Sequence, residues 1–181
     1  GDPAGFKRAA LSSTMRTHLR ANQVNELDSA IGELVNGGVF FAMRSCEYSF
    51  TSDPQPKTEI VTVGDIRFLR AGREVKSNLE DADTVVITFR SQKNGVKDEE
   101  QARVSDKNAK WSAVKCWAKI VNRIRSYKGT NDSTPISTVK VHGKFHQVTA
   151  DDVNRVIKQT ARETDAKLSL AKYSSHSVRV T

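Results

Sequence analysis

The segment over residues 84–104 constrains the fold more than any other part of the chain. It begins with TVVITFR, a run rich in β-branched residues, and this composition favours a strand. Asn94 and Gly95 follow, and they are the residue pair most typical of a tight hairpin turn. Residues 101–104 form the predicted return strand. The segment therefore predicts an antiparallel β hairpin.

Two further regions extend the predicted β structure. Residues 59–69 are rich in isoleucine and valine, which favours a strand, and Ala71 and Gly72 then favour a turn. Together with the hairpin, this strand gives a small three-stranded antiparallel sheet. A short separate hairpin is predicted over residues 139–148, around Gly143.

Amphipathic helices are predicted on both sides of this sheet along the sequence. Apolar residues recur at three- and four-residue steps over 23–35, and Asn36, Gly37 and Gly38 are expected to interrupt that helix. Residues 111–127 place Val114, Trp117, Ala118, Val121 and Ile124 on one helical face.

A last long helix is predicted to begin near Thr149, where Asp152 suggests a capping arrangement. The order of elements predicts an α+β fold, mostly helical, with the small sheet in its middle. One domain is expected over residues 23–181, preceded by a basic N-terminal extension over residues 1–22.

Composition narrows the class of partner. The 181 residues are 37% hydrophobic and 28% charged, which is typical of a globular protein. Lysine and arginine exceed aspartate and glutamate by 29 to 21, and this net charge of +8 favours a polyanionic partner such as nucleic acid.

The cysteines and the apolar runs bear on the cellular setting. Cys46 and Cys116 lie far apart and have no CxxC partner, so neither a disulfide framework nor a zinc site is indicated. No run approaches the roughly 20 apolar residues that cross a bilayer. We expect an intracellular protein of the nucleus or cytoplasm, with no membrane partner and no metal.

Arg44 is the first candidate for an anion-binding residue. It follows an apolar run over 39–43 that should be buried, and a guanidinium at the end of a buried segment needs an anionic partner or ligand. Glu47 lies three residues later, and for these two residues taken alone a local ion pair is the favoured explanation.

The sequence SSHSVR holds the second candidate. Ser175 is expected to cap a helix whose first turn carries His176 and Arg179 on one face, an arrangement that can receive a phosphate. An exposed histidine and arginine without a ligand would show the same spacing. Lys93 and Lys97 flank the predicted hairpin turn, where lysines usually remain solvated.

The order of these elements resembles the catalytic domain of the tyrosine recombinase, or phage integrase, family. The resemblance rests on FFAMRSCEYS, ITFRSQKNGVK and HSVR, and it covers residues 22–179. It implies that double-stranded DNA is the partner and that DNA is broken and rejoined through a 3′-phosphotyrosyl intermediate. No cofactor is implied.

The resemblance also implies roles for individual residues. Arg44 and Arg179 would hold the non-bridging oxygens of the scissile phosphate, with Glu47 supporting Arg44, and His176 would assist proton handling. This agrees with physical chemistry, because preorganised cations stabilise the charge that gathers on a phosphate under attack. Arginine suits the task since its planar fork binds two oxygens at once.

A lysine on the hairpin completes the implied set. Lys93 would protonate the departing 5′ oxygen, and Lys97 is the alternative if the turn is offset. Lysine can act as this acid when its surroundings lower its pKa. Contacts to the DNA backbone are expected from a further group of basic residues: Arg90, Lys97, Lys115, Lys119 and Arg123. For those on the helix over 111–127, a solvated face is the commoner explanation.

The family's nucleophilic tyrosine lies well beyond its second arginine, and this sequence has only two residues after Arg179. Neither Tyr48 nor Tyr127 has the expected place, and Tyr173 is expected to be a packing residue. We therefore expect a fragment truncated before the nucleophile, inactive in cleavage as it stands. Self-association or a protein partner would cover the truncated end.

Two other hypotheses remain open. The chain could be a naturally truncated, non-enzymatic derivative that acts as a DNA- or protein-interaction module. It could also be an unrelated basic α+β adaptor, and in that case Arg44, Lys93, His176 and Arg179 should not converge.

Overall fold

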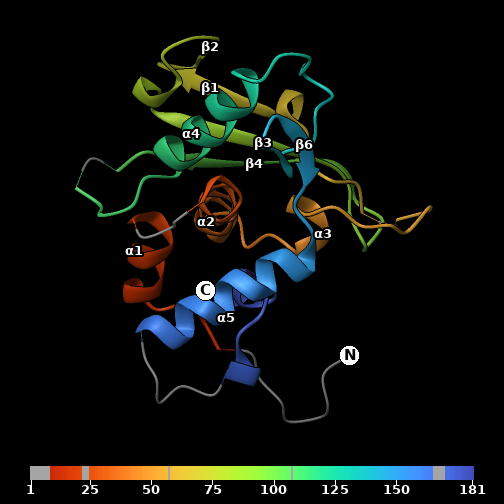
Figure 1. Cartoon of the computed structure of the whole chain (residues 1–181). Coiled ribbons are helices and arrows are strands. Elements are labelled where there is room, and N and C mark those ends of the chain that lie inside the picture. Colours follow the sequence, from red (N-terminus) through yellow and green to blue (C-terminus); the bar gives the residue numbers. More distant parts are fainter. Residues whose placement is uncertain (1–8, 22–24, 57, 107, 165–169) are drawn as a thin grey trace.

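A computed structural model describes residues 9–21, 25–56, 58–106, 108–164 and 170–181. The fold is α+β, as predicted. A four-stranded antiparallel sheet lies on one side of the molecule and helix α5 (Ala150–Thr164) on the other (Figure 1). Helices α1 (Ser13–Ala21) and α2 (Glu26–Val39) lie between them, and α4 (Ala113–Arg125) packs against both α2 and the sheet.

The sheet has four strands rather than the three predicted. Strands β1 (Ile66–Arg70), β2 (Arg73–Val75), β3 (Thr84–Ser91) and β4 (Lys97–Val104) are arranged in the order β2-β1-β3-β4. Strand β2 escapes prediction because it has only three residues, none of them buried. The first strand is also shorter than predicted, since residues Val63–Asp65 form a 3₁₀ turn.

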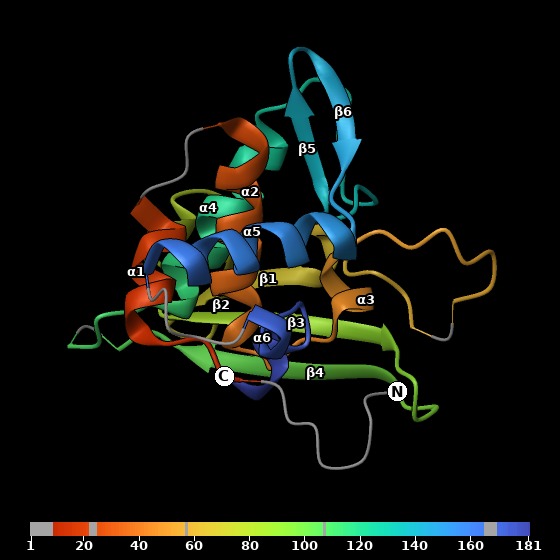
Figure 2. The same ribbon diagram turned by 60° about the horizontal axis from the view of Figure 1, so that its bottom comes forward.

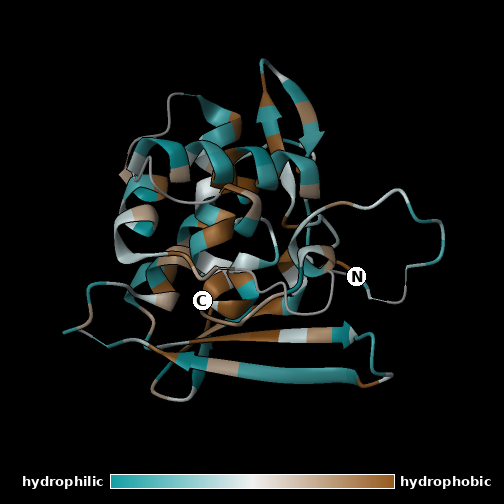
Figure 3. Cartoon of the chain, turned by 90° about the horizontal axis from the view of Figure 1, so that it is seen from below, coloured by the Kyte–Doolittle hydropathy of each residue, from teal (hydrophilic) through white to brown (hydrophobic). Residues whose placement is uncertain are grey.

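The predicted hairpin is present as β3 and β4. Strand β3 buries Val85, Ile87 and Phe89, whereas the edge strand β4 is mostly charged; Figure 3 shows this contrast in colour. Such charges keep an edge strand from pairing with other chains. Gly95 takes a positive φ of 82°, and its N–H donates to the Gln92 carbonyl, so Lys93 and Asn94 occupy the tip of the turn.

Helix α2 continues through the residues expected to interrupt it. A Cβ on Gly37 would lie 3.0 Å from Ile120 Cδ1, and the Trp117 Nε1–H donates to the Gly37 carbonyl over 2.9 Å. A Cβ on Gly38 would lie 3.1 Å from Val178 Cγ1. These glycines therefore allow close packing of other elements on α2, and they do not end it.

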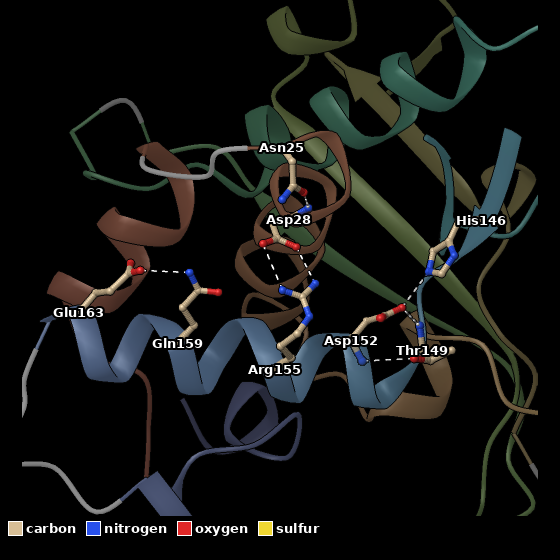
Figure 4. Close-up of polar contacts among 8 residues, drawn as sticks. All are labelled: Asn25, Asp28, His146, Thr149, Asp152, Arg155, Gln159 and Glu163. Atoms are coloured by element: carbon tan, nitrogen blue, oxygen red, sulfur yellow. Dashed lines mark hydrogen bonds and ion pairs between the residues drawn. The ribbon is translucent and has the colours of Figure 1, made fainter. Parts of the chain in front are cut away.

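Helix α5 begins as predicted and is fastened to its neighbours by polar contacts (Figure 4). Thr149 and Asp152 exchange backbone-to-side-chain hydrogen bonds of 3.0 and 3.2 Å, which form the predicted cap. Arg155 binds Asp28 of α2 with two hydrogen bonds of 2.6 and 3.2 Å. His146, on the hairpin of β5 (Thr138–Val141) and β6 (Lys144–Gln147), contacts Asp152 at 2.9 Å.

The described part of the predicted N-terminal extension belongs to the core. Met15 and Leu19 of α1 are fully buried, and α1 packs against α2 and α5. Residues 1–8 and 22 of that predicted segment lie outside the described residues. Among the helices that the structure describes, none is both long and apolar enough to cross a membrane.

Candidate phosphate-binding site

Arg44 stands where the chain leaves α2 and turns into the short helix α3 (Ser45–Tyr48). Ala42 has a positive φ of 47°, which bends the chain sharply, and the following Met43 is fully buried. The Arg44 backbone N–H donates to Glu47 Oε2 over 2.7 Å, and its guanidinium Nη1 lies 3.5 Å from Glu47 Oε1. The arginine is thus fixed at both its backbone and its side chain.

Glu47 is the centre of the site. Its side chain is only 6% exposed, and burial raises the pKa of its carboxyl. The Arg44 N–H, the Arg44 guanidinium and the Arg179 guanidinium all oppose this rise. One buried carboxyl therefore attracts two arginines, Arg44 from the same short segment and Arg179 from the distant C-terminal segment.

Arg179 lies near enough to attract the Glu47 carboxyl because the turn that carries it is anchored to α2 and α3. This turn leads into the short helix α6 (Ser177–Val180). The Tyr48 hydroxyl donates to the Ser175 carbonyl over 3.1 Å, and Val178 is fully buried against Gly38.

Side-chain oxygens fix the start of the same turn. The Ser175 N–H donates to Asn154 Oδ1 of α5 over 2.6 Å, and the His176 N–H donates to Ser174 Oγ over 3.2 Å. The N-cap of α6 is His176, whose side chain makes no capping hydrogen bond, so Ser175 does not cap this helix as predicted.

The structure brings together some of the predicted site residues. Arg44 is paired with Glu47, Arg179 attracts the same carboxyl without an ion pair among the described residues, and His176 is exposed on the turn that carries Arg179. Lys93 is exposed at the tip of the β3–β4 hairpin, on the same side of the molecule as α3 (Figures 1 and 2). No contact joins Lys93 to the cluster among the described residues.

The base of this hairpin is connected to α3. Arg90 donates to the Ile60 carbonyl over 2.8 Å and to Asp65 over 3.1 Å. The next residue, Val61, donates its N–H to the Glu47 carbonyl over 2.9 Å. Arg90 was a predicted DNA contact, but its guanidinium holds this connecting segment in place.

The other predicted DNA contacts comprise one arginine with an internal role and three exposed lysines. Arg123 binds Glu33 at 3.4 Å and the Thr138 carbonyl at 2.9 Å, so its role is internal. Lys97, Lys115 and Lys119 are exposed and form no ion pair within the described parts of the chain. They remain free to contact a ligand.

The three tyrosines have structural roles. Tyr48 is fully buried, and burial strongly raises the pKa of its hydroxyl. The Tyr127 hydroxyl accepts from Arg123 over 3.1 Å, and Tyr173 is 6% exposed. Because a nucleophile must reach its phosphate and lose its proton, none of the three suits that role.

Sequence patterns did not indicate the positioning roles of Tyr48, Asn154 and Val178. The only available signal was the placement of Tyr48 one residue after Glu47. In the described parts of the chain, no group of three or more histidine, cysteine, aspartate or glutamate side chains is arranged to hold a metal. No protein-family model matches the chain, and a search of curated proteins finds no match either.

Proposed function

We propose that this chain is a DNA-binding catalytic domain of the tyrosine recombinase type, in which Arg44 and Arg179 bind one phosphate of the DNA backbone. The observation that carries the proposal is the shared carboxylate of Glu47. It pairs with the Arg44 guanidinium at 3.5 Å and attracts the Arg179 guanidinium, so two cations are drawn toward one carboxyl before any ligand arrives, and such preorganisation is what phosphoryl-transfer sites require.

The finer roles belong to the same proposal. His176 assists at the phosphate, and Lys93 closes over it from the hairpin as the acid for the leaving oxygen. The order of elements supports this, since a buried helix leading to Arg44, a hairpin bearing Lys93 and the HSVR turn follow one another as they do in that family. With no suitable tyrosine among its three, this chain is expected to bind DNA without forming a covalent link to it.

Binding of a labelled DNA duplex across a salt series tests the proposal. We expect Arg44→Ala with Arg179→Ala to weaken binding at least tenfold, and to lower the slope of log affinity against log salt by about 0.9 for each phosphate that is no longer bound. Arg44→Lys keeps the charge but removes the planar fork, and so should weaken binding as well.

Arg73→Ala is the matched control, because Arg73 is exposed on β2 and makes no contact with the site. It should bind as the wild type does. Equal affinity of the wild type and the double variant would show that the arginine pair does not bind DNA.

A further inference from the structure

A second group of cations gathers around one indole ring. The guanidinium carbons of Arg16 and Arg20, on α1, lie 4.8 and 5.9 Å from the centre of the Trp111 ring. Lys110 Nζ lies 5.2 Å from the same centre. Long basic side chains lose much conformational freedom on binding, and contact with a rigid ring removes part of that freedom in advance.

Two lysines of α4 extend this group. Lys115 and Lys119 lie one helical turn apart, and both line a cleft of about 510 Å³ together with Arg20 and Lys110. We call Arg16, Arg20, Lys110, Lys115 and Lys119 the Trp111 cluster. Three carboxylates also line the cleft, those of Glu33, Glu80 and Asp106.

The charges of the cluster are not matched by ion pairs. None of its five side chains forms one within the described ranges. The Glu33 side chain is 10% exposed and already bound by Arg123, and the Asp106 carboxylate accepts the Asn108 N–H over 2.9 Å. One Arg16 nitrogen, Nη2, is buried without any hydrogen-bond partner among those residues. Cations held this close together repel one another, so an external anion would stabilise them.

The extent of the cluster indicates the kind of anion. Its members come from α1, from α4 and from the loop before α4, and Arg20, Lys110, Lys115 and Lys119 line the cleft. Cations spread over three segments of the chain suit the regularly spaced phosphates of a nucleic-acid strand. We propose that the Trp111 cluster is a second binding surface for the phosphate backbone of duplex DNA, separate from the Arg44–Arg179 site.

The separation of the two sites is visible in the fold. Helix α1, which carries Arg16 and Arg20, and helix α3, which follows Arg44, lie on opposite sides of α2 (Figures 1 and 2). This inference goes beyond the proposed function, because it involves none of the residues of the arginine site. It stands even if that site binds no DNA.

Duplex binding by a triple variant tests it. We expect Arg20→Gln, Lys110→Gln and Lys119→Gln together to weaken binding at least tenfold, and to lower the salt slope by about 2–3, which is about 0.9 per phosphate. The control removes the same charge elsewhere, with Arg70→Gln, Arg73→Gln and Lys128→Gln on exposed residues. Equal reductions in affinity in the two triple variants would overturn the proposal.

The two free cysteines separate this result from that of the arginine site. Cys46 lies on α3 and Cys116 lines the cleft, and both are partly exposed. Alkylation with iodoacetamide, followed by mass spectrometry, can measure each thiol with and without DNA. DNA protection of Cys116 supports the second surface, whether or not Cys46 is protected. Protection of Cys46 alone would overturn it.

Discussion

Tyr48 buries its ring beside the arginine site and donates its hydroxyl proton to the Ser175 carbonyl. Replacement by phenylalanine keeps the ring and leaves this carbonyl without its donor. We expect Tyr48→Phe to lower the free energy of unfolding by about 1–2 kcal/mol, measured by urea denaturation. DNA affinity should fall too, because the turn bearing Arg179 loses an anchor.

Tyr173→Phe is the matched control for this change. Tyr173 is also buried, but its hydroxyl forms no hydrogen bond with the described residues. It should leave both stability and DNA affinity unchanged. Equal effects of the two substitutions would show that the Tyr48 hydroxyl does not anchor the turn.

The protonation of Glu47 makes the free energy of unfolding depend on pH. Burial raises the pKa of its carboxyl above the ordinary 4.5, so the folded state binds a proton more tightly than the unfolded chain does. As pH rises from 4.5 through the raised pKa, the folded state loses this advantage, and the contribution of Glu47 to stability falls. Glu47→Gln should abolish that fall.

Urea denaturation of both proteins at several pH values above about 4 measures the difference. The free energy of unfolding of the wild type minus that of Glu47→Gln should decrease as pH rises. A difference that grows with pH would mean that Arg44 and Arg179 outweigh burial at this carboxyl.

Residues of the site could be predicted from the sequence only where the interacting side chains lie close together along the chain. Arg44 and Glu47 lie three apart, and their contact was predictable from that spacing. The attraction of Arg179 for the same carboxylate depends on how α6 docks on Gly38, a contact between distant segments. Ser175 was mistaken for the cap because serine commonly caps helices, whereas α6 begins at Ser177 and His176 precedes it without a side-chain cap.

At the scale of elements, the contact between α2 and α5 is the most sharply testable. Arg155 is about half exposed, but its partner Asp28 is 4% exposed. Arg155→Ala would leave a buried carboxylate unpaired, and we expect a loss of about 1–3 kcal/mol in the free energy of unfolding. Adding Asp28→Asn should recover part of this loss, measured by thermal or urea denaturation.

The periodicity of apolar residues predicted α4 and α5 well, because their apolar faces repeat without interruption. The capping residue Thr149 also indicated the start of α5. It failed at Asn36–Gly38, where glycine normally weakens a helix. The helix persists there because Trp117 and Ile120 pack on the bare backbone. Such packing cannot be seen in the local sequence of α2.

At the scale of the whole molecule, α1 is part of the single core. Met15 is fully buried and lies in the segment that the sequence analysis predicted to be a basic extension outside the domain. We expect Met15→Ala to lower the free energy of unfolding by about 2–5 kcal/mol. Far-UV circular dichroism and tryptophan fluorescence should report the same unfolding transition in this variant. If residues 13–21 were instead a separately folded extension, the substitution would change the free energy of unfolding of the rest of the domain very little.

The hydrogen bond from Tyr48 to Ser175 also sets an order of events. It joins segments far apart in the sequence, and closing so long a loop costs more chain entropy than forming the β3–β4 hairpin. Arg179 is therefore brought near Arg44 late in folding. Local unfolding of α6 would separate the two arginines while the sheet remains folded. An anion that binds both arginines would stabilise the docked position of α6 and so slow the amide hydrogen exchange of residues 173–181.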